Sequence, residues 1–66
     1  MKEEMTKFKM EDQVYAWIMD HFYLDQIKLE RFELLPGGYL ITDRNGDRMV
    51  VWWDIVHQKV DWRTEK

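Results

Sequence analysis

A stripe of largely apolar residues runs through the first third of the chain at helical spacing. Its members fall at i, i+3, i+4, i+7 and i+8, the repeat of one helix face, and they are Val14, Trp17, Ile18, His21 and Phe22. No Gly or Pro, either of which would weaken a helix, interrupts this stretch. The pattern predicts a helix from Glu11 to about Leu24, with a start that falls between Thr6 and Glu11.

Two turn signals divide the middle of the chain into strands. Pro36-Gly37 suits the centre of a type II turn, because Pro presets φ and Gly accepts a positive φ. Asn45-Gly46 is typical of a two-residue type I′ hairpin turn, in which both central residues have a positive φ. β-Branched and aromatic residues flank both turns, so we predict three consecutive antiparallel strands, the first over residues 27–35 after a tight connection at Asp25-Gln26.

The two turns together predict which side chains share a face of the sheet. Two-residue turns would pair Arg44 with Asp47 and Leu35 with Gly38. Because cross-strand partners lie on the same side of a sheet, one apolar face then forms under the helix, made of Phe32, Leu34, Tyr39, Ile41, Val50 and Trp52.

The first predicted strand contains a conflict of phase. Ile27 and Leu29 are in phase with each other but out of phase with Phe32 and Leu34. We therefore expect either a bulge between the two pairs or a strand whose first few residues are unpaired, and we favour pairing from about Lys28.

The tail of the chain fits two interpretations, a short helix capped by Asp54 or a turn followed by a fourth strand. A three-residue loop over residues 56–58 would pair Trp52 with Trp62 and add Val60 and Trp62 to the apolar face. Alternation of the Val-x-Trp type favours the strand. We predict an α+β fold, one N-terminal helix packed on a four-stranded antiparallel meander sheet (α-β-β-β-β), with α-β-β-β-α as the alternative.

The length and composition indicate a single small domain. It has 66 residues, and we expect its polar start, residues 1–9, to be frayed. It contains no cysteine for a disulfide or a thiolate metal site, and charges of both signs are mixed along it to a net −3. No apolar run approaches the roughly 20 residues of a membrane span, and the N-terminal segment lacks the apolar stretch of a signal peptide. We expect a cytoplasmic protein.

The opposite face of the predicted sheet is also apolar. Four strands make a sheet about 19 Å wide, whereas one helix is about 10–12 Å across, so the helix cannot cover both faces. Exposed apolar area with a polar rim is typical of an interaction surface. We expect a homodimer, or binding of another protein, through Leu35, Leu40, Met49, Val51 and Trp53. The alternative is that the N-terminal segment, with Met5 and Phe8, covers this face.

The sequence contains no recognisable catalytic or metal-binding pattern. It has no Cys or Ser nucleophile and no Gly-rich phosphate loop. Residues 43–47 resemble a calcium loop only in composition, because the Gly stands fourth and strands flank it, so we expect a hairpin turn. His21 and Asp25 lack a predictable third ligand, and His57 has no evident acid partner. We therefore expect a protein that is not an enzyme and binds no metal or cofactor.

Single-stranded nucleic acid is the alternative ligand. Sheets with exposed aromatic residues and neighbouring Arg side chains stack bases, and Trp53 with Arg31 and Arg63 offers such a set. Glu33 and Asp61 lie among these residues and the net charge is negative, which opposes the binding of a polyanion. The favoured partner is therefore protein, and no membrane partner is expected.

The run from Leu35 to Trp53, LPGGYLITDRNGDRMVVWW, resembles short uncharacterised proteins encoded by phages and prophages of Gram-positive bacteria. It covers about a third of the chain. Its matching features are the two turns and the aliphatic-aromatic strand, which are signals of fold. The resemblance implies a small accessory protein and carries over no catalytic residue.

Overall fold

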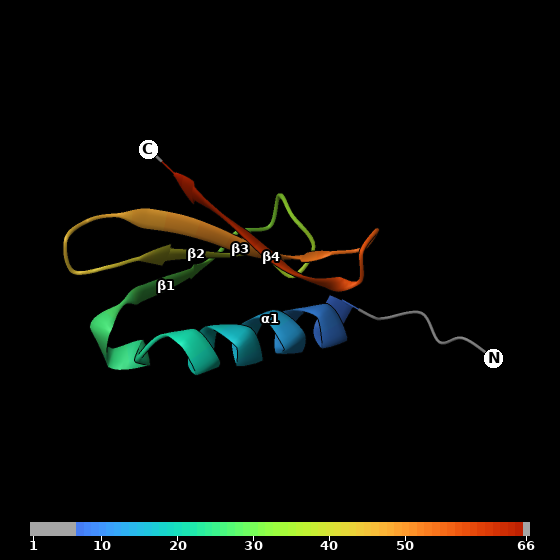
Figure 1. The fold of residues 1–66 in the computed structure, drawn as a ribbon, viewed down its shortest axis with the longest axis horizontal. Coiled ribbons are helices and arrows are strands. Elements are labelled where there is room, and N and C mark those ends of the chain that lie inside the picture. The colour runs from blue at the N-terminus through green and yellow to red at the C-terminus, as the bar shows by residue number, and fades with distance from the viewer. Residues whose placement is uncertain (1–6, 66) are drawn as a thin grey trace.

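The helix and strands follow the predicted order. The computed structural model describes residues 7–65, and its elements are α1 (Lys7–His21), the short 3₁₀ turn η1 (Leu24–Gln26), β1 (Lys28–Arg31), β2 (Tyr39–Thr42), β3 (Arg48–Asp54) and β4 (Lys59–Glu65). Neighbouring strands are antiparallel and lie in the order β1-β2-β3-β4 (Figure 1). The α-β-β-β-β prediction is confirmed, including the strand interpretation of the tail.

Compared with the predicted helix over residues 11–24, α1 begins earlier and ends earlier. It begins at Lys7, inside the interval predicted for its start, and ends at His21, before the predicted end near Leu24. Residues 7–9, which we expected to be frayed, are helical. Residues 1–6, the rest of that segment, lie outside the described residues.

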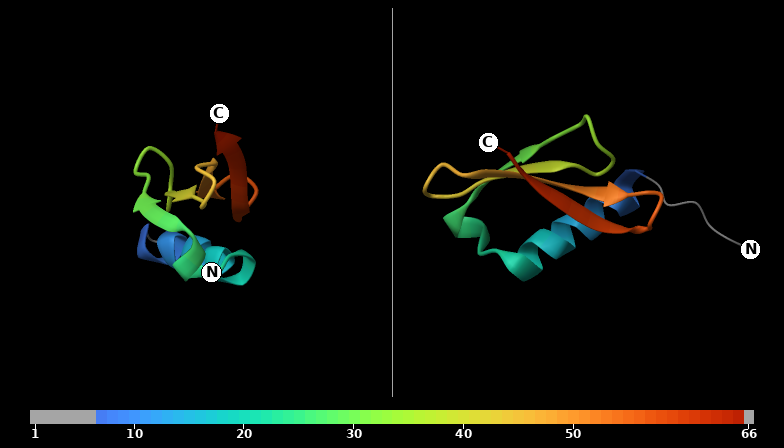
Figure 2. Two further views of the ribbon diagram at one scale, coloured as in Figure 1. Left: turned by 90° about the vertical axis from the view of Figure 1, so that its left-hand side faces the viewer. Right: turned by 45° about the horizontal axis from the view of Figure 1, so that its top comes forward.

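The core forms where α1 packs along one face of the sheet (Figures 1 and 2). Val14 and Ile18 are fully buried there, together with Ile41 and Val51 from the two central strands. The other large apolar members of the predicted helix stripe are half-buried against this cluster, namely Trp17 and Phe22. Helical spacing therefore identified the inward side of α1 correctly.

Each hairpin, however, closes in a different register from the one that its turn predicts. The observed pairs include Arg31 with Tyr39, Ile41 with Met49, and Val51 with Trp62, where the predicted pairs were Leu34 with Tyr39, Ile41 with Val50, and Trp52 with Trp62. The shifts are of three residues, one residue and one residue. Because side chains alternate between faces, every odd shift turns one strand over relative to its neighbour.

A three-residue loop accounts for the shift in the central hairpin. Gly46 N–H donates to Asp43 O at 3.0 Å, and Asp43 N–H donates to Asp47 O at 2.9 Å. Gly46 has a φ of +88°, whereas Asn45 does not have the positive φ that a type I′ turn needs. The Asp43 carboxylate fixes the loop by accepting the backbone N–H groups of Asn45 and Asp47. This is a type I turn followed by a left-handed glycine, and it adds one residue to the connection.

The predicted turn at Pro36-Gly37 forms, but it does not close the first hairpin. Gly38 N–H donates to Leu35 O at 3.0 Å across the turn, and Gly37 has a φ of +58°. The ladder ends with a bond from Phe32 N–H to Gly38 O, so three further residues enter the connection. Pro36 O accepts the N–H of Trp53 at 2.8 Å, which docks the turn on β3.

This longer connection resolves the phase conflict of the first strand. β1 begins at Lys28, as predicted, and ends at Arg31 rather than near residue 35. Leu29 lies on the helix side of the sheet and packs against the core. No bulge is needed, because Leu34 lies in the connection and is 85% exposed.

The connection between β3 and β4 is also one residue longer than predicted. Asp54 pairs with Lys59, which leaves residues 55–58 in the turn instead of residues 56–58. The turn ends on Gln58, whose φ of +54° lies in the left-handed region. The two odd shifts on either side of β3 cancel, so β4 keeps the predicted face while β3 is turned over.

The helix side of the sheet therefore differs from the predicted set. It consists of Leu29, Arg31, Tyr39, Ile41, Met49, Val51, Trp53, Val60, Trp62 and Thr64. Val50 and Trp52, which the prediction placed under the helix, lie on the outer side, and Phe32 and Leu34 are not part of the strand. These assignments were wrong because the loops are longer than the turn dipeptides suggest.

Apolar side chains on the outer side of the sheet, the side away from α1, are shielded from solvent. Leu40 and Val50 pair there and are only 8% and 1% exposed. Part of the connection over residues 32–38 rises on the side of the sheet away from α1 (Figures 1 and 2), whereas Gly37 lies close to the helix backbone at Met10. The alternative cover, by Met5 and Phe8, involves side chains outside the described residues.

Two glycines with left-handed backbones, Gly37 and Gly46, differ in how closely they approach the rest of the protein, so their substitution tests how tightly residues 32–38 pack against the helix. A Cβ on Gly37 would lie 2.9 Å from Met10 C and O in the helix backbone, whereas a Cβ on Gly46 would meet nothing within 4 Å. Both substitutions to Ala share the cost of a left-handed residue, about 1–2 kcal/mol. We expect Gly37→Ala to reduce the free energy of unfolding by at least about 1 kcal/mol more than Gly46→Ala, because of overpacking. Urea unfolding of both variants tests this, and equal effects would show that the contact is not tight.

Candidate interaction site

The predicted apolar interaction surface does not exist as one face. Met49, Val51 and Trp53 lie on the helix side, where Val51 is fully buried and the other two pack against the core. Leu40 is on the outer side but buried, and Leu35 is half-buried in the connection. The physical reason is the register of β3, which places Met49, Val51 and Trp53 on the helix side. The homodimer expected through this set therefore lacks the surface on which it was predicted.

The residues of the nucleic-acid alternative are also separated. Trp53 and Arg31 lie on the helix side and Arg63 lies on the outer side. Arg31 Nη2 is 2.6 Å from Glu11 Oε2 in an ion pair, and its guanidinium lies 5.4 Å from the ring centroid of Tyr39. Burial raises the pKa of Tyr39, and the positive charge of Arg31 opposes this rise. These three residues therefore form no common platform for stacked bases.

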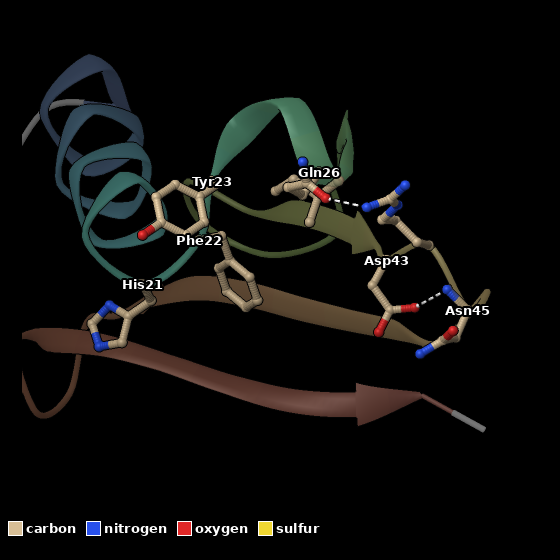
Figure 3. Close-up of a pocket in the computed structure, with 8 residues that line it drawn as sticks. His21, Phe22, Tyr23, Gln26, Asp43 and Asn45 are labelled. Atoms are coloured by element: carbon tan, nitrogen blue, oxygen red, sulfur yellow. Dashed lines mark hydrogen bonds between the residues drawn. The ribbon is translucent and has the colours of Figure 1, made fainter.

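An open hollow of about 300 Å³ lies at the C-terminal end of α1 (Figure 3). It is lined by His21, Phe22, Tyr23, Gln26, Ile27, Asp43, Arg44 and Asn45. Arg44 Nη1 donates to Gln26 Oε1 at 2.6 Å and so ties the β2–β3 loop to η1. The arrangement holds the loop in place and presents a polar rim on one wall.

His21 is held by the helix at the edge of this hollow. Its ring stacks on Trp17 with centroids 3.9 Å apart, and its Nδ1 lies 2.7 Å from the Trp17 carbonyl oxygen. A carbonyl oxygen only accepts, so Nδ1 must carry the proton and donate.

Within residues 7–65, no group of three or more His, Asp and Glu side chains is placed to hold a metal ion. In the same part of the chain, no helix has the length and apolar character to cross a bilayer.

The turn after β3 contains an acid–base pair that the sequence reading missed. Asp54 Oδ2 lies 2.7 Å from His57 Nδ1, and Asp54 Oδ1 accepts the N–H groups of Val56 and His57 at 3.0 and 3.2 Å. The hydrogen bond from the His57 ring, followed by the backbone donors, holds the pKa of Asp54 below its usual 3.8. The available signal was an Asp at the start of a turn with His three residues later.

The outermost strand offers a second feature, a row of backbone groups directed away from the sheet. In an antiparallel pair, alternate residues direct both N–H and C=O toward the same neighbour. Asp43 N–H donates to Asp47 O, and Trp53 N–H donates to Pro36 O. The backbone N–H and C=O groups of odd-numbered residues in β3 therefore point toward β2, and those of even-numbered residues point toward β4. By the same alternation, odd residues of β4 bond β3. The groups of Val60, Trp62 and Thr64 therefore point outward.

This edge is longer than the edge on the other side of the sheet. β4 has seven residues, and Trp62 on it is 50% exposed. β1 has four residues, of which only Leu29 and Arg31 direct backbone groups outward by the same alternation. On β4, the Trp62 N–H is occupied by the neighbouring Asp61 Oδ1 at 2.8 Å, which confirms that it does not bond β3.

Comparison with known proteins adds nothing to this geometry. No protein family, curated protein or solved structure matches the chain. Its function must therefore be inferred from the arrangement of its own residues.

Substitution of Trp53 tests the corrected faces of the sheet. A glutamate on the helix side places a charge against the core, so Trp53→Glu should lower the free energy of unfolding by about 2–4 kcal/mol. Trp62→Glu, at the exposed end of the same side, should cost about 1 kcal/mol or less. Circular dichroism during urea unfolding measures both. A cost of Trp53→Glu no larger than that of Trp62→Glu would contradict the register found here.

The lowered pKa of Asp54 predicts how the β3–β4 turn responds to acid. The ionised carboxylate is stabilised in the folded state, so its contribution to stability is present above pH 3.8 and is lost as the pH falls through the lower folded pKa. Carbon NMR of the Asp54 carboxyl group should show a midpoint below 3.8. His57→Ala should move this midpoint upward, because it removes the largest cause. An unchanged midpoint in that variant would assign the shift to the backbone donors.

Proposed function

We propose that the chain is a non-enzymatic protein-interaction module that binds another polypeptide by strand addition at the edge of β4, with which no further strand of residues 7–65 pairs. The observation that carries the proposal is the row of outward backbone groups at Val60, Trp62 and Thr64. Unpaired N–H and C=O groups on an edge strand are a template for a further strand. Recognition of extended peptides in this way is a recurrent mode of protein binding.

The side chains of β4 make this edge selective. Val60, Trp62 and Thr64 face the helix side, while Lys59, Asp61, Arg63 and Glu65 face the outer side. An added strand would therefore meet apolar groups on one face and alternating charges on the other. Main-chain bonds supply affinity in such a complex, and alternate side chains supply specificity.

The opposing interpretation is that these charges only protect the edge. Native sheets place charged residues on edge strands to prevent unwanted pairing, and Asp61 already occupies the N–H of Trp62. The length of β4 and the half-exposed Trp62 favour binding, because a short edge strand is one of the devices by which sheets avoid pairing and β4 has seven residues. A role as a small phage or prophage accessory protein, which the resemblance of residues 35–53 implies, is part of this proposal.

Selection from a random heptapeptide library tests strand addition without knowledge of the natural partner. We expect peptides that bind the protein to shift the amide NMR signals of Val60, Trp62 and Thr64 more than those of other residues. Thr64→Pro removes one outward N–H and leaves the bonds between β3 and β4 in place, so it should weaken binding by about tenfold or more.

Thr64→Val is the matched control, because it removes the hydroxyl group and keeps both the N–H and the branched Cβ. Peptides that bind this variant but not Thr64→Pro would support the edge as the binding element. Peptides that bind Thr64→Pro equally well, or that shift signals elsewhere, would contradict the proposal.

A further inference from the structure

The outer-face charges of β4 are arranged symmetrically about Trp62. Lys59 and Glu65 stand three residues before and after it, and Asp61 and Arg63 stand directly on either side. Two such strands, placed antiparallel with Trp62 opposite Trp62, would therefore set Lys59 against Glu65 and Asp61 against Arg63 twice. Opposite charges on directly opposed residues stabilise an antiparallel pair.

Neighbouring registers lack this complementarity. A shift of two residues is the smallest that keeps the same side chains on the same face. One such shift opposes Asp61 to itself and Lys59 to Arg63, and the other opposes Arg63 to itself and Asp61 to Glu65. Both place like charges opposite each other, which is destabilising. The charges of β4 thus select a single register for pairing with itself.

The backbone of the edge fits the same register. Residues with outward groups must oppose one another to exchange hydrogen bonds in an antiparallel pair. With Trp62 on the symmetry axis, it faces itself, and Val60 faces Thr64 of the second copy, so all three outward residues are matched. Trp62, half-exposed in the single chain, would be covered by its symmetry mate on the helix side.

We propose that the partner strand at β4 is a second copy of this chain, in the register that places Trp62 opposite Trp62. This inference rests on the proposed function and names its partner. The two copies are related by a twofold axis perpendicular to the sheet, which is the closed symmetry of most homodimers. Their sheets join into one antiparallel sheet of eight strands, with both copies of α1 on the same face.

The dimer is expected to be weak. One strand edge buries less area than the about 1,200–2,000 Å² of stable interfaces, and exposed charge pairs add little each. We expect a dissociation constant of about 10 μM to 1 mM, so sedimentation should be followed up to about 1 mM protein. The N–H of Trp62 must also leave Asp61 Oδ1 for the second copy, which frees Asp61 to meet Arg63.

Charge reversal provides the test. Asp61→Arg places an arginine opposite Arg63 of the other copy on both sides of Trp62. Arg63→Asp places an aspartate opposite Asp61 of the other copy in the same way. Each variant alone should weaken the dimer at least about tenfold in sedimentation equilibrium. An equimolar mixture of the two variants places opposite charges at every such position. The mixture should therefore form heterodimers about as well as the unmodified chain forms homodimers.

The mixture is decisive, because recovery of the dimer cannot come from a variant that has lost its fold. If either variant is unfolded by circular dichroism, two peptides of equal composition replace it. KVDWRTE, the sequence of β4, should compete with the dimer and bring its Trp ring against Trp62. EVRWDTK opposes like charges when its Trp faces Trp62 and opposite charges two residues out of that register, so it should not show the contacts between the two Trp rings that NMR detects for KVDWRTE. Such contacts with both peptides would overturn the register.

The failures of the two proposals can be told apart. A chain that stays monomeric at about 1 mM while library peptides bind its β4 edge would overturn the second copy as partner and keep strand addition. A dimer that Thr64→Pro or either reversed variant leaves intact would place self-association elsewhere. Reversed variants that stay monomeric when mixed would overturn the register that places Trp62 opposite Trp62. A monomer that binds no peptide would overturn both.

Discussion

Hydrogen bonds inside the loops determine which face of the sheet each strand presents to the helix. The Asp43 and Asp54 carboxylates each accept two backbone N–H groups in the connection that follows them. These bonds favour loops of three and four residues, closed by Gly46 and Gln58 in the left-handed region. Each loop is one residue longer than the loop that the sequence predicts. β3 is therefore turned so that Val51 and Trp53, and not Val50 and Trp52, reach the helix.

This constraint also determines how one helix suffices for a sheet with apolar residues on both sides. Turning β3 over gives the larger apolar set, with Met49, Val51 and Trp53, to the helix side. The outer side keeps Leu40 and Val50, which are buried on the side where residues 32–38 rise. Pro36 and Gly37 anchor that connection, through the bond to Trp53 and the close approach to the helix backbone at Met10. Within residues 7–65, the apolar pair Leu40 and Val50 on the outer side is therefore not left open.

The sequence predicts the elements well because the signals for them are local. The stripe through Val14 and Ile18, the turn at Pro36-Gly37 and the Val60-x-Trp62 alternation each depend on a few neighbouring residues, and each was confirmed. The register depends on loop length, and Asn45-Gly46 suits a three-residue loop with Gly last as well as a two-residue turn. The candidate surface inherited this ambiguity, because one residue of slip exchanges the faces of a strand. The edge of β4 was not foreseen, since strand order and bond direction follow only from the assembled sheet.

The chemistry of the β4 edge limits what can bind there. Asp61 and Trp62 already satisfy each other in the single chain, through the bond from Trp62 N–H to Asp61 Oδ1. An incoming strand must break this bond, and a freed carboxylate next to a new backbone carbonyl would be unfavourable without a cation. The strand must therefore offer a carbonyl opposite Trp62 and a positive side chain opposite Asp61. In the proposed complex, a strand without that cation would leave the bond between Asp61 and Trp62 in place, so Asp61 would both protect the edge and select the partner.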